Sequence, residues 1–283
     1  MSIDVTVQDA PCGAWVTGLD LTKPLDPASV AAIRATWLQH QVLAFPDQPM
    51  SVDDLERFAS AIGPYGPDPY FESIPDHPHV AQVKREADET SSIFADNWHS
   101  DWSFLSSPPA ATLLFGNVIP PVGGDTLFAN QYAAWETLSP SMKNLLQGKQ
   151  GIHSARRGYA RSGRYGEADK GRSMAIRYDD SALATQLHAL ARVHPETQRV
   201  ALYVSPGYTI GIDGLPDDEA QDLLRELYAH QGRDQFVYRH RWQADMLVMW
   251  DNRCLVHAAT GGYQGHRRLL HRITVGERAG VPT

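Results

Sequence analysis

Two histidines and one aspartate have the types and the spacing to bind a metal ion. His99 and Asp101 lie two positions apart in the aromatic stretch 97–104. Alternate residues of an extended strand point to the same face, so we expect these two side chains to point together. His257, in the distant segment 250–257, would add a second imidazole. Two histidines and one carboxylate on one side of a metal, with other positions open, are typical of non-heme Fe(II) oxygenases.

The His-x-acid pattern is weak evidence when it stands alone. His194 and Glu196 fit the pattern as well, but the proline between them and the polar residues 197–199 predict a turn. That turn leads into the apolar strand 200–204. The first site stands out only through His257 and the residues that accompany it.

A second feature is a predicted strand that carries two arginines. The apolar and β-branched residues of 267–275 predict a strand in which Arg268, Leu270, Arg272 and Thr274 share one face. Burying a guanidinium group without a partner is energetically unfavourable, and guanidinium groups bind carboxylates through two parallel hydrogen bonds. We therefore expect anions to bind at this face. The alternatives are a pair of internal salt bridges or a solvated arginine face.

Several segments together make the sequence resemble a known family. They are Trp98–Asp101, Gly123–Thr126, Trp250–His257, and the spacing from His257 to Arg268 and Arg272. In these segments the chain resembles the Fe(II)- and 2-oxoglutarate-dependent dioxygenases of the taurine dioxygenase and 2,4-dichlorophenoxyacetate dioxygenase (TauD/TfdA) group. The likeness runs over nearly the whole chain, from Gly13 to Val275.

The resemblance implies a role for each matching residue. His99, Asp101 and His257 match the iron ligands, and Thr126 and Arg268 match the residues that hold the distal carboxylate of 2-oxoglutarate. The cofactor is then Fe(II), and the cosubstrates are 2-oxoglutarate and O2. Because the related halogenases have a small residue where this chain has Asp101, hydroxylation with release of succinate and CO2 is expected.

The resemblance also bears on the substrate. Arg272 matches the arginine that faces the acidic group of the substrate in this family, whereas Asp68 and Phe71 stand where taurine enzymes are expected to have a histidine and a tyrosine. The likeness of 86–101 and 133–140 favours a small acidic, aryloxyalkanoate-like carboxylate over taurine. A sulfonate, a sulfate ester or an amino-acid-derived substrate is the alternative.

Aromatic residues near the site are candidates for the walls of a substrate pocket. They are Trp102, Phe104, Tyr159 and Tyr208. Aromatic residues beside strands also commonly belong to the core.

Two other classes of protein remain open. A non-catalytic jelly-roll binding module could have this fold, but it would have no reason to keep three ligands and two internal arginines together. An iron enzyme that does not use 2-oxoglutarate could have the triad, yet it would not need Thr126 and Arg268.

Short strands must position most of these residues. Helices are predicted after Asp26, after Ser51, over 132–146 with a break at 139–140, and over 217–230. The proline-containing region 65–94 favours loop. Many short strands with few helices indicate a two-sheet β structure. The resemblance makes it a double-stranded β-helix, the cupin-like jelly roll, mainly β with flanking helices and a single domain over 1–283.

The segment 156–180 carries seven Lys and Arg side chains among glycines, and two readings of it remain open. Such a charge run is usually a solvated loop. The functional alternative is a mobile lid that draws in an anionic substrate and shields the site from water.

Composition restricts the partners and the cellular location that we expect for the protein. A net charge of −8 argues against a nucleic-acid partner. The N-terminal residues lack the features of a signal peptide, and no apolar run approaches the length of a membrane span. Cys12 and Cys254 imply no disulfide framework. We therefore expect a cytoplasmic enzyme that acts on a small molecule, and by analogy with the family a homo-oligomer, a dimer or a tetramer.

Overall fold

A large and a small β-sheet form the centre of the computed structural model, which describes residues 3–280. The large sheet has the order β1 (Asp4–Val7), β2 (Ala14–Thr17), β3 (Val42–Phe45), β14 (Leu247–Asp251), β6 (Ala111–Val118), β16 (Arg268–Val275), β5 (His77–Arg85) and β4 (Ser73–Ile74). The small sheet has the order β13 (Val237–His240), β7 (Thr126–Asn130) and β15 (Leu255–Ala259). Its two pairs are antiparallel, and so are those of the large sheet except β2 with β3.

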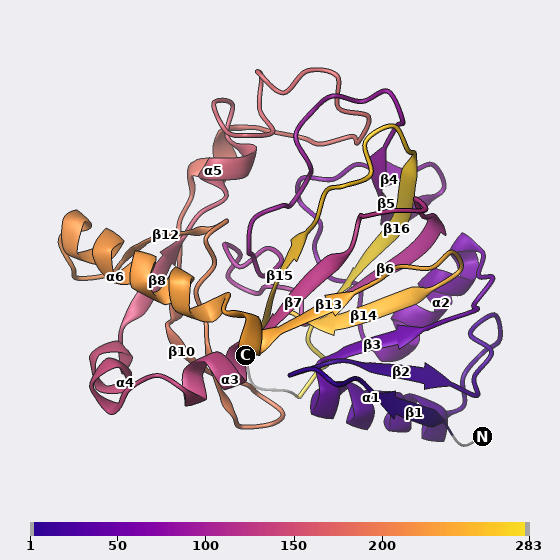
Figure 1. Cartoon of the computed structure of the whole chain (residues 1–283), viewed down its shortest axis with the longest axis horizontal. Helices are drawn as coiled ribbons and strands as arrows, with labels where there is room; N and C mark the ends of the chain where they lie inside the picture. The colour runs from indigo at the N-terminus through magenta and orange to yellow at the C-terminus, as the bar shows by residue number, and fades with distance from the viewer. Residues whose placement is uncertain (1–2, 281–283) are drawn as a thin grey trace.

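Helices and two smaller sheets surround this centre (Figure 1). The helices are α1 (Pro27–His40), α2 (Val52–Ile62), α3 (Gln131–Glu136), α4 (Pro140–Leu146), α5 (Arg156–Tyr159) and α6 (Asp217–Gln231), with 3₁₀ turns at Asp180–Leu183 and Asp234–Phe236. The smaller sheets are β12 (Thr209–Ile212) with β8 (Gln150–His153) and β9 (Gln186–Ala189), and β10 (Ala191–Val193) with β11 (Val200–Leu202). The architecture is mainly β with flanking helices, as predicted. Among residues 3–280, no helix combines the length and the apolar character that a membrane span requires.

The central strands of the large sheet, β3, β14 and β6, are buried on both faces, and their alternate residues enter different cores. In β14, Leu247 and Met249 pack with the residues of α1 and α2, whereas Val248 and Trp250 pack with residues of the small sheet. The period of two in a strand produces this division. Burying a large apolar side chain stabilises the fold by roughly 1.5–3 kcal/mol, so the two layers hold the central strands rigidly.

The first two helices begin where the sequence predicts. The Asp26 side chain accepts a hydrogen bond from the backbone N–H of Ser29 at 2.7 Å, and Pro27 is the first residue of α1. Ser51 and Asp54 form the predicted capping box at the start of α2, with Asp in the position where Glu is usual.

The prediction of loop over 65–94 is wrong in its middle part, 73–85. β4 and β5 lie there, at the edge of the large sheet. Pro78 lies near the start of β5, whereas the pairs with β16 involve only Ala81 to Arg85. A proline has no backbone N–H to donate, so it is compatible with a strand position that makes no ladder pair, and the proline content therefore misled the prediction.

Candidate active site

His99 and His257 are brought together by their backbones. The N–H of His99 donates to the carbonyl of His257 at 3.0 Å, and the N–H of His257 donates to the carbonyl of His99 at 2.8 Å. His257 lies in β15, but His99 forms only an isolated bridge. The predicted extended strand around His99 is therefore wrong. The chain turns at Asp101, and Trp102 has a φ of +49°.

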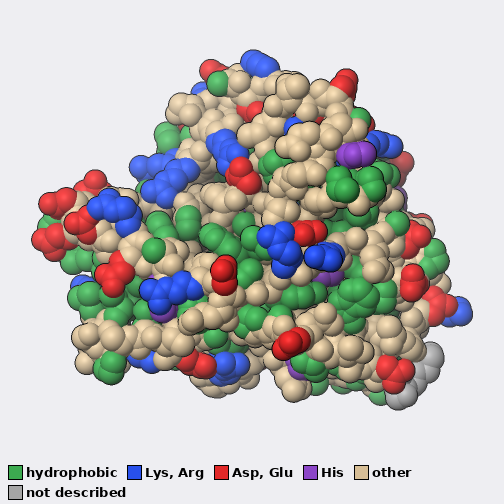
Figure 2. Space-filling view, in the orientation of Figure 1, with side chains coloured by type: hydrophobic (Ala, Val, Ile, Leu, Met, Phe, Trp, Pro, Cys, Tyr) green, Lys and Arg blue, Asp and Glu red, His purple; other side chains and the backbone are tan. Residues whose placement is uncertain are grey.

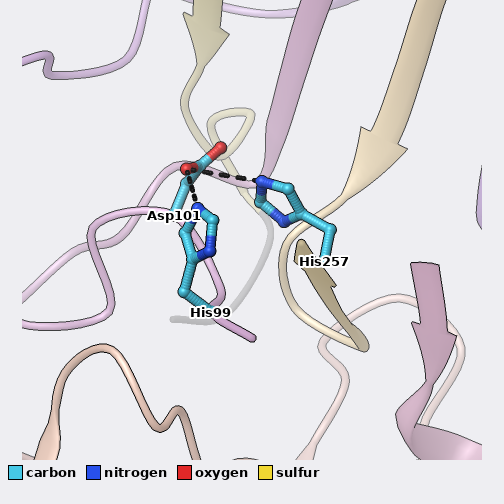
Figure 3. Close-up of side chains that lie close together, drawn as sticks. All are labelled: His99, Asp101 and His257. Carbon is cyan, nitrogen blue, oxygen red and sulfur yellow. Dashed lines mark ion pairs between the residues drawn. The ribbon is translucent and has the colours of Figure 1, made fainter. Parts of the chain in front are cut away.

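The predicted triad nevertheless converges on one point (Figure 3). Oδ1 of Asp101 lies 3.7 Å from Nε2 of His99 and 3.8 Å from Nε2 of His257. All three side chains are buried, and their ligand atoms lie within 4.8 Å of one another. Two imidazole nitrogens and one carboxylate oxygen at this separation fit a single Fe(II) ion with its remaining positions open to other ligands.

Burial prepares both histidines as ligands, and a hydrogen bond orients the ring of His99. Nδ1 of His99 lies 2.8 Å from the carbonyl of Asn97, so it carries the proton and leaves the lone pair of Nε2 facing Asp101. Burial lowers the pKa of His99 and lowers that of His257 to about 3. Both imidazoles are therefore neutral near pH 7, which is the state that binds a metal.

The second oxygen of Asp101 is turned away from the histidines. Oδ2 accepts a hydrogen bond from Oγ1 of Thr112 at 2.6 Å and lies 3.1 Å from Nη2 of Arg272. Nδ2 of Asn252 donates to the same Thr112 oxygen at 2.9 Å. Burial alone would raise the pKa of Asp101, but Arg272 and the two histidines outweigh it and hold the pKa below its usual value. Neither Thr112 nor Asn252 was predicted to belong to the site, although Asn252 lies in a segment that carries the family likeness.

Arg268 and Thr126 lie at the same cavity as the triad. Nη2 of Arg268 donates to the carbonyl of Gly124 at 3.2 Å, while its buried Nε has no hydrogen-bond partner among residues 3–280. Arg268 also forms no ion pair within the described residues, and burial lowers its pKa. Nε1 of Trp242 donates to Oγ1 of Thr126 at 3.0 Å. A buried guanidinium in this state is prepared to receive an anion.

Arg272 lies four residues further along β16 and has a different environment. It is 4% exposed and forms ion pairs with Asp68 and Asp101. Burial raises the pKa of Asp68 to about 6, although Arg272 opposes the shift. The two arginines of this face thus differ: Arg272 forms internal salt bridges, whereas Arg268 forms none in the described part of the chain.

A cavity of about 190 Å³ joins these groups. The triad, Thr126, Arg268 and Arg272 line it, together with the predicted wall residues Phe71, Trp102, Tyr159 and Tyr208. Two predicted substrate residues need correction, because Asp68 and Phe104 are not among the lining residues. Phe104 packs behind Tyr208, with the two ring centroids 5.0 Å apart. Lining residues that the sequence analysis did not predict include Phe94, Asn97, Tyr165 and Tyr263.

The arginine-rich segment 156–180 covers one side of the cavity. Arg157, Tyr159, Arg164, Tyr165 and Arg172 from this segment line the cavity. On the face shown in Figure 2, Lys and Arg side chains gather beside α5. A segment in this place has the position that a lid requires, and its role as a lid stays a prediction.

A second buried cluster around His194 is structural. Nδ1 of His194 accepts from the backbone N–H groups of Glu196 and Thr197 at 3.2 and 3.1 Å, so residues 195–197 form the predicted turn. Its Nε2 lies 3.1 Å from Asp251, whose two carboxylate oxygens both also accept from Arg253. The charge of Asp251 is thus compensated by Arg253 of the chain itself.

A mainly β chain of two facing sheets that brings together two histidines, one carboxylate and an unpaired buried arginine is typical of the non-heme iron oxygenases. The family described as "Taurine catabolism dioxygenase TauD, TfdA family" matches residues 6–274. The chain belongs to this family.

Relatives and solved structures agree with this membership. The (S)-phenoxypropionate/alpha-ketoglutarate-dioxygenase of Sphingobium herbicidovorans is 30% identical over 98% of this chain and 96% of its own length. The alpha-ketoglutarate-dependent 2,4-dichlorophenoxyacetate dioxygenase of Cupriavidus pinatubonensis is 33% identical over 92% and 93% of the two chains. A taurine dioxygenase from Burkholderia xenovorans has a TM-score of 0.81 at 30% identity and covers 98% and 92% of the two chains.

The comparisons confirm the predicted jelly roll and decide between the protein classes that the sequence left open. The protein is an Fe(II)- and 2-oxoglutarate-dependent dioxygenase, where 2-oxoglutarate is the alpha-ketoglutarate of the relatives' names. Its substrates are small molecules.

Proposed function

We propose that this dioxygenase hydroxylates a small organic molecule bearing an aromatic or similarly apolar group. His99, Asp101 and His257 hold the iron, and Arg268 with Thr126 holds the distal carboxylate of 2-oxoglutarate. The observation that carries the proposal is Arg268, a buried arginine without an ion pair among residues 3–280, on the same cavity as the triad.

The surroundings of Arg268 support its role toward the dicarboxylate. Gly124 has a φ of +71°, and a Cβ there would lie 3.2 Å from Nε of Arg268, so a glycine permits the loop to pass close to the guanidinium. The rings of Trp242 and Tyr263 have centroids 5.8 Å from Cζ of Arg268. These contacts limit the positions of the guanidinium and lower the entropy lost on binding.

Each residue of the site has a physical task in the reaction. When bound, Fe(II) and 2-oxoglutarate with O2 supply the oxidising equivalents that convert a C–H bond to C–OH, and succinate and CO2 are released. The neutral imidazoles and the ionised Asp101 offer three ligand atoms on one side and leave the cavity side for the cosubstrates. Arg272 and Thr112 hold the second oxygen of Asp101, so the carboxylate keeps its orientation. The segment 156–180 would exclude water while the substrate is bound.

Aromatic residues support an aromatic or apolar substrate. Phe71, Trp102, Tyr159 and Tyr208 line the cavity, and such rings favour edge-to-face or offset contacts with another ring. The two phenoxy-acid dioxygenases among the relatives act on aryl ethers by their names. A sulfonate, sulfate ester or amino-acid-derived substrate is the alternative.

Anaerobic calorimetry of the ferrous protein with 2-oxoglutarate tests the cosubstrate site. Arg268→Ala should weaken 2-oxoglutarate binding about 30-fold or more, because removing one partner of a buried charge pair costs about 2 kcal/mol or more. Ferrous binding should be unchanged. Arg267→Ala is the matched control, because Arg267 is adjacent on the chain but exposed and paired with Glu86. Unchanged cosubstrate affinity in Arg268→Ala would remove Arg268 from this role.

Succinate formation under air, with 2-oxoglutarate present, tests the substrate class. The panel comprises phenoxy-carboxylic acids, neutral aryl ethers, sulfonates, sulfate esters and amino acids. We expect the aryl compounds to stimulate succinate formation most. Stimulation by taurine or by amino acids alone would contradict the proposed aromatic substrate.

A further inference from the structure

Arg272 is balanced by two carboxylates of the chain itself. Its Nη1 donates to Oδ2 of Asp68, and its Nη2 lies 3.1 Å from Oδ2 of Asp101. The ring centroids of Phe71 and Trp102 lie 4.9 and 5.1 Å from its Cζ. The charge of this arginine is thus compensated, and its faces are covered, by residues of the chain.

The contrast with Arg268 shows which arginine is prepared for an external anion. Both residues lie on β16 and line the same cavity. Arg268 forms no ion pair within the described residues, whereas Arg272 forms two. A dicarboxylate that binds at Arg268 therefore meets a guanidinium without a carboxylate beside it, whereas an acid that approaches Arg272 meets a charge that Asp68 and Asp101 already compensate.

The loop that carries Asp68 is held against β16. The N–H of Gly66 donates to the carbonyl of Thr274 at 2.9 Å, and Oγ1 of Thr274 donates to the carbonyl of Pro67 at 3.0 Å. A Cβ at position 66 would lie 2.9 Å from Oγ1 of Thr274, so glycine permits this close approach. A carboxylate held in place this way has a high effective concentration at Arg272, with which a free acid must compete.

The other cations that line the cavity are also paired or exposed. The ion pairs are Lys84 with Glu86, Arg85 with Glu89, Arg164 with Asp96, and Arg172 with Asp169. Arg157 is exposed and donates to the carbonyls of Pro206 and Thr209. Among the described residues, Arg268 is thus the buried lining cation that lacks a carboxylate partner.

We propose that Asp68 is a specificity-determining residue: although it does not line the cavity, its carboxylate compensates the charge of Arg272 that the acidic group of a substrate would otherwise use. The substrate then presents a neutral group to this part of the cavity, beside Phe71 and Trp102. An acid bound there would bring a third carboxylate to an arginine that two buried carboxylates already neutralise, which is unfavourable. The inference rests on the proposed function, and it replaces the acidic group that the family resemblance predicted at Arg272.

Phenoxyacetate and phenoxyacetamide test this proposal, because they differ in charge but hardly in size. Binding is measured by calorimetry to the protein loaded with Fe(II) and 2-oxoglutarate without O2, so no turnover occurs. Wild type should bind the amide at least as tightly as the acid. Asp68→Asn should raise the affinity for phenoxyacetate relative to the amide about tenfold or more, since Arg272 then lacks one carboxylate. Glu72→Gln, the same charge change at an exposed position of the same loop, should leave the ratio unchanged.

Two results would overturn the proposal. One is a wild-type preference for the acid of tenfold or more, and the other is no gain in phenoxyacetate affinity in Asp68→Asn. Saturable 2-oxoglutarate binding is measured first on every protein, and its absence in wild type would refute the proposed function instead. If Asp68→Asn does not fold, Asp68→Ala provides the second test. Acetate should raise the Tm of Asp68→Ala more than acetamide does. Acetate should also raise the Tm of Asp68→Ala more than it raises the Tm of wild type. Equal shifts would overturn the proposal.

Discussion

At the scale of single residues, the candidate iron ligands differ in the partners of the polar atom that would not bind the metal. Nδ1 of His99 donates to a backbone carbonyl, and Oδ2 of Asp101 has Thr112 and Arg272 as partners. Nδ1 of His257 is buried without a hydrogen-bond partner among residues 3–280. Partners of this kind orient metal ligands and tune their basicity. The orientation of His257 therefore depends on its strand and on ring contacts, such as that with Trp250 at a centroid distance of 4.7 Å.

Thr112→Val should weaken ferrous binding about 10- to 100-fold, the usual effect of removing a partner that orients a metal ligand. The variant keeps the shape of the side chain but removes the donor at 2.6 Å from Asp101. Equilibrium titration with Fe(II) under anaerobic conditions measures the change. Thr36→Val, in which the lost hydroxyl donates to Ala32 within α1, is the control and should bind iron as wild type does. Equal affinities in all three proteins would show that Thr112 does not orient the ligand.

At the scale of elements, one strand and one loop assemble the anion site. β16 carries Arg268 and Arg272 to the cavity, as its alternating pattern predicts. The loop before β7 brings Gly124 and Thr126 to the same place, where the carbonyl of Gly124 accepts from Arg268. The close approach depends on a glycine with positive φ, so the loop conformation and the position of the guanidinium are coupled.

Gly124→Ala should weaken 2-oxoglutarate binding and should also lower the free energy of unfolding. Its Cβ would meet Nε of Arg268 at 3.2 Å, and its φ of +71° is unfavourable for alanine by about 1–2 kcal/mol. Gly148→Ala is a matched control, because Gly148 has a φ of +75° and no atom within 4 Å of the new Cβ. Urea unfolding should show a similar loss in both variants. Calorimetry should show weaker 2-oxoglutarate binding only in Gly124→Ala, and equal binding in the two variants would contradict the coupling.

At the scale of the whole molecule, the two-sheet core buries histidines that the active site does not use. His240 is fully buried, and its Nδ1 lies 2.9 Å from the hydroxyl of Tyr238. Burial lowers the pKa of His240 and of His153 to about 3. Since an unfolded histidine has a pKa of about 6.5, the unfolded state binds more protons than the folded state between these values. Stability is therefore lost as the pH falls below 6.5.

The free energy of unfolding should thus decrease between pH 7 and pH 5. One histidine with this shift contributes at most about 2 kcal/mol of the loss over that interval. His240→Gln should reduce the decrease by up to that amount, measured by urea unfolding at both pH values. His266→Gln, at an exposed position, should leave the decrease as in wild type. An equal decrease in His240→Gln and wild type would exclude His240 as a cause.

Assembly also belongs to this scale, and it stays a prediction. The family resemblance leads us to expect a dimer or a tetramer. Light scattering coupled to size-exclusion chromatography measures the mass directly, and a single species near the chain mass of 31.3 kDa would contradict the expectation.

Local signals made much of the fold predictable from the sequence. The caps at Asp26 and Ser51, the break between α3 and α4, and the strand with Arg268 and Arg272 all depend on residues close to one another in the chain. Such patterns depend on residues close together in the chain, so they can be interpreted without knowledge of the fold. Strand β5 was missed because its pairing with β16 joins residues that are distant in the sequence.

By itself, the sequence determined which residues are candidates for the site: His99, Asp101 and His257 through their types and spacing, and Thr126 and Arg268 through the family resemblance. Only the tertiary structure decided how they meet. His99 and Asp101 converge through one backbone bridge and a turn, not through the predicted strand. The sequence likewise left open whether Arg268 and Arg272 form ion pairs, because that depends on which carboxylates the folded chain brings beside them. Asp68, 204 residues away in sequence, pairs with Arg272, and that contact depends on the packing of a distant loop against β16.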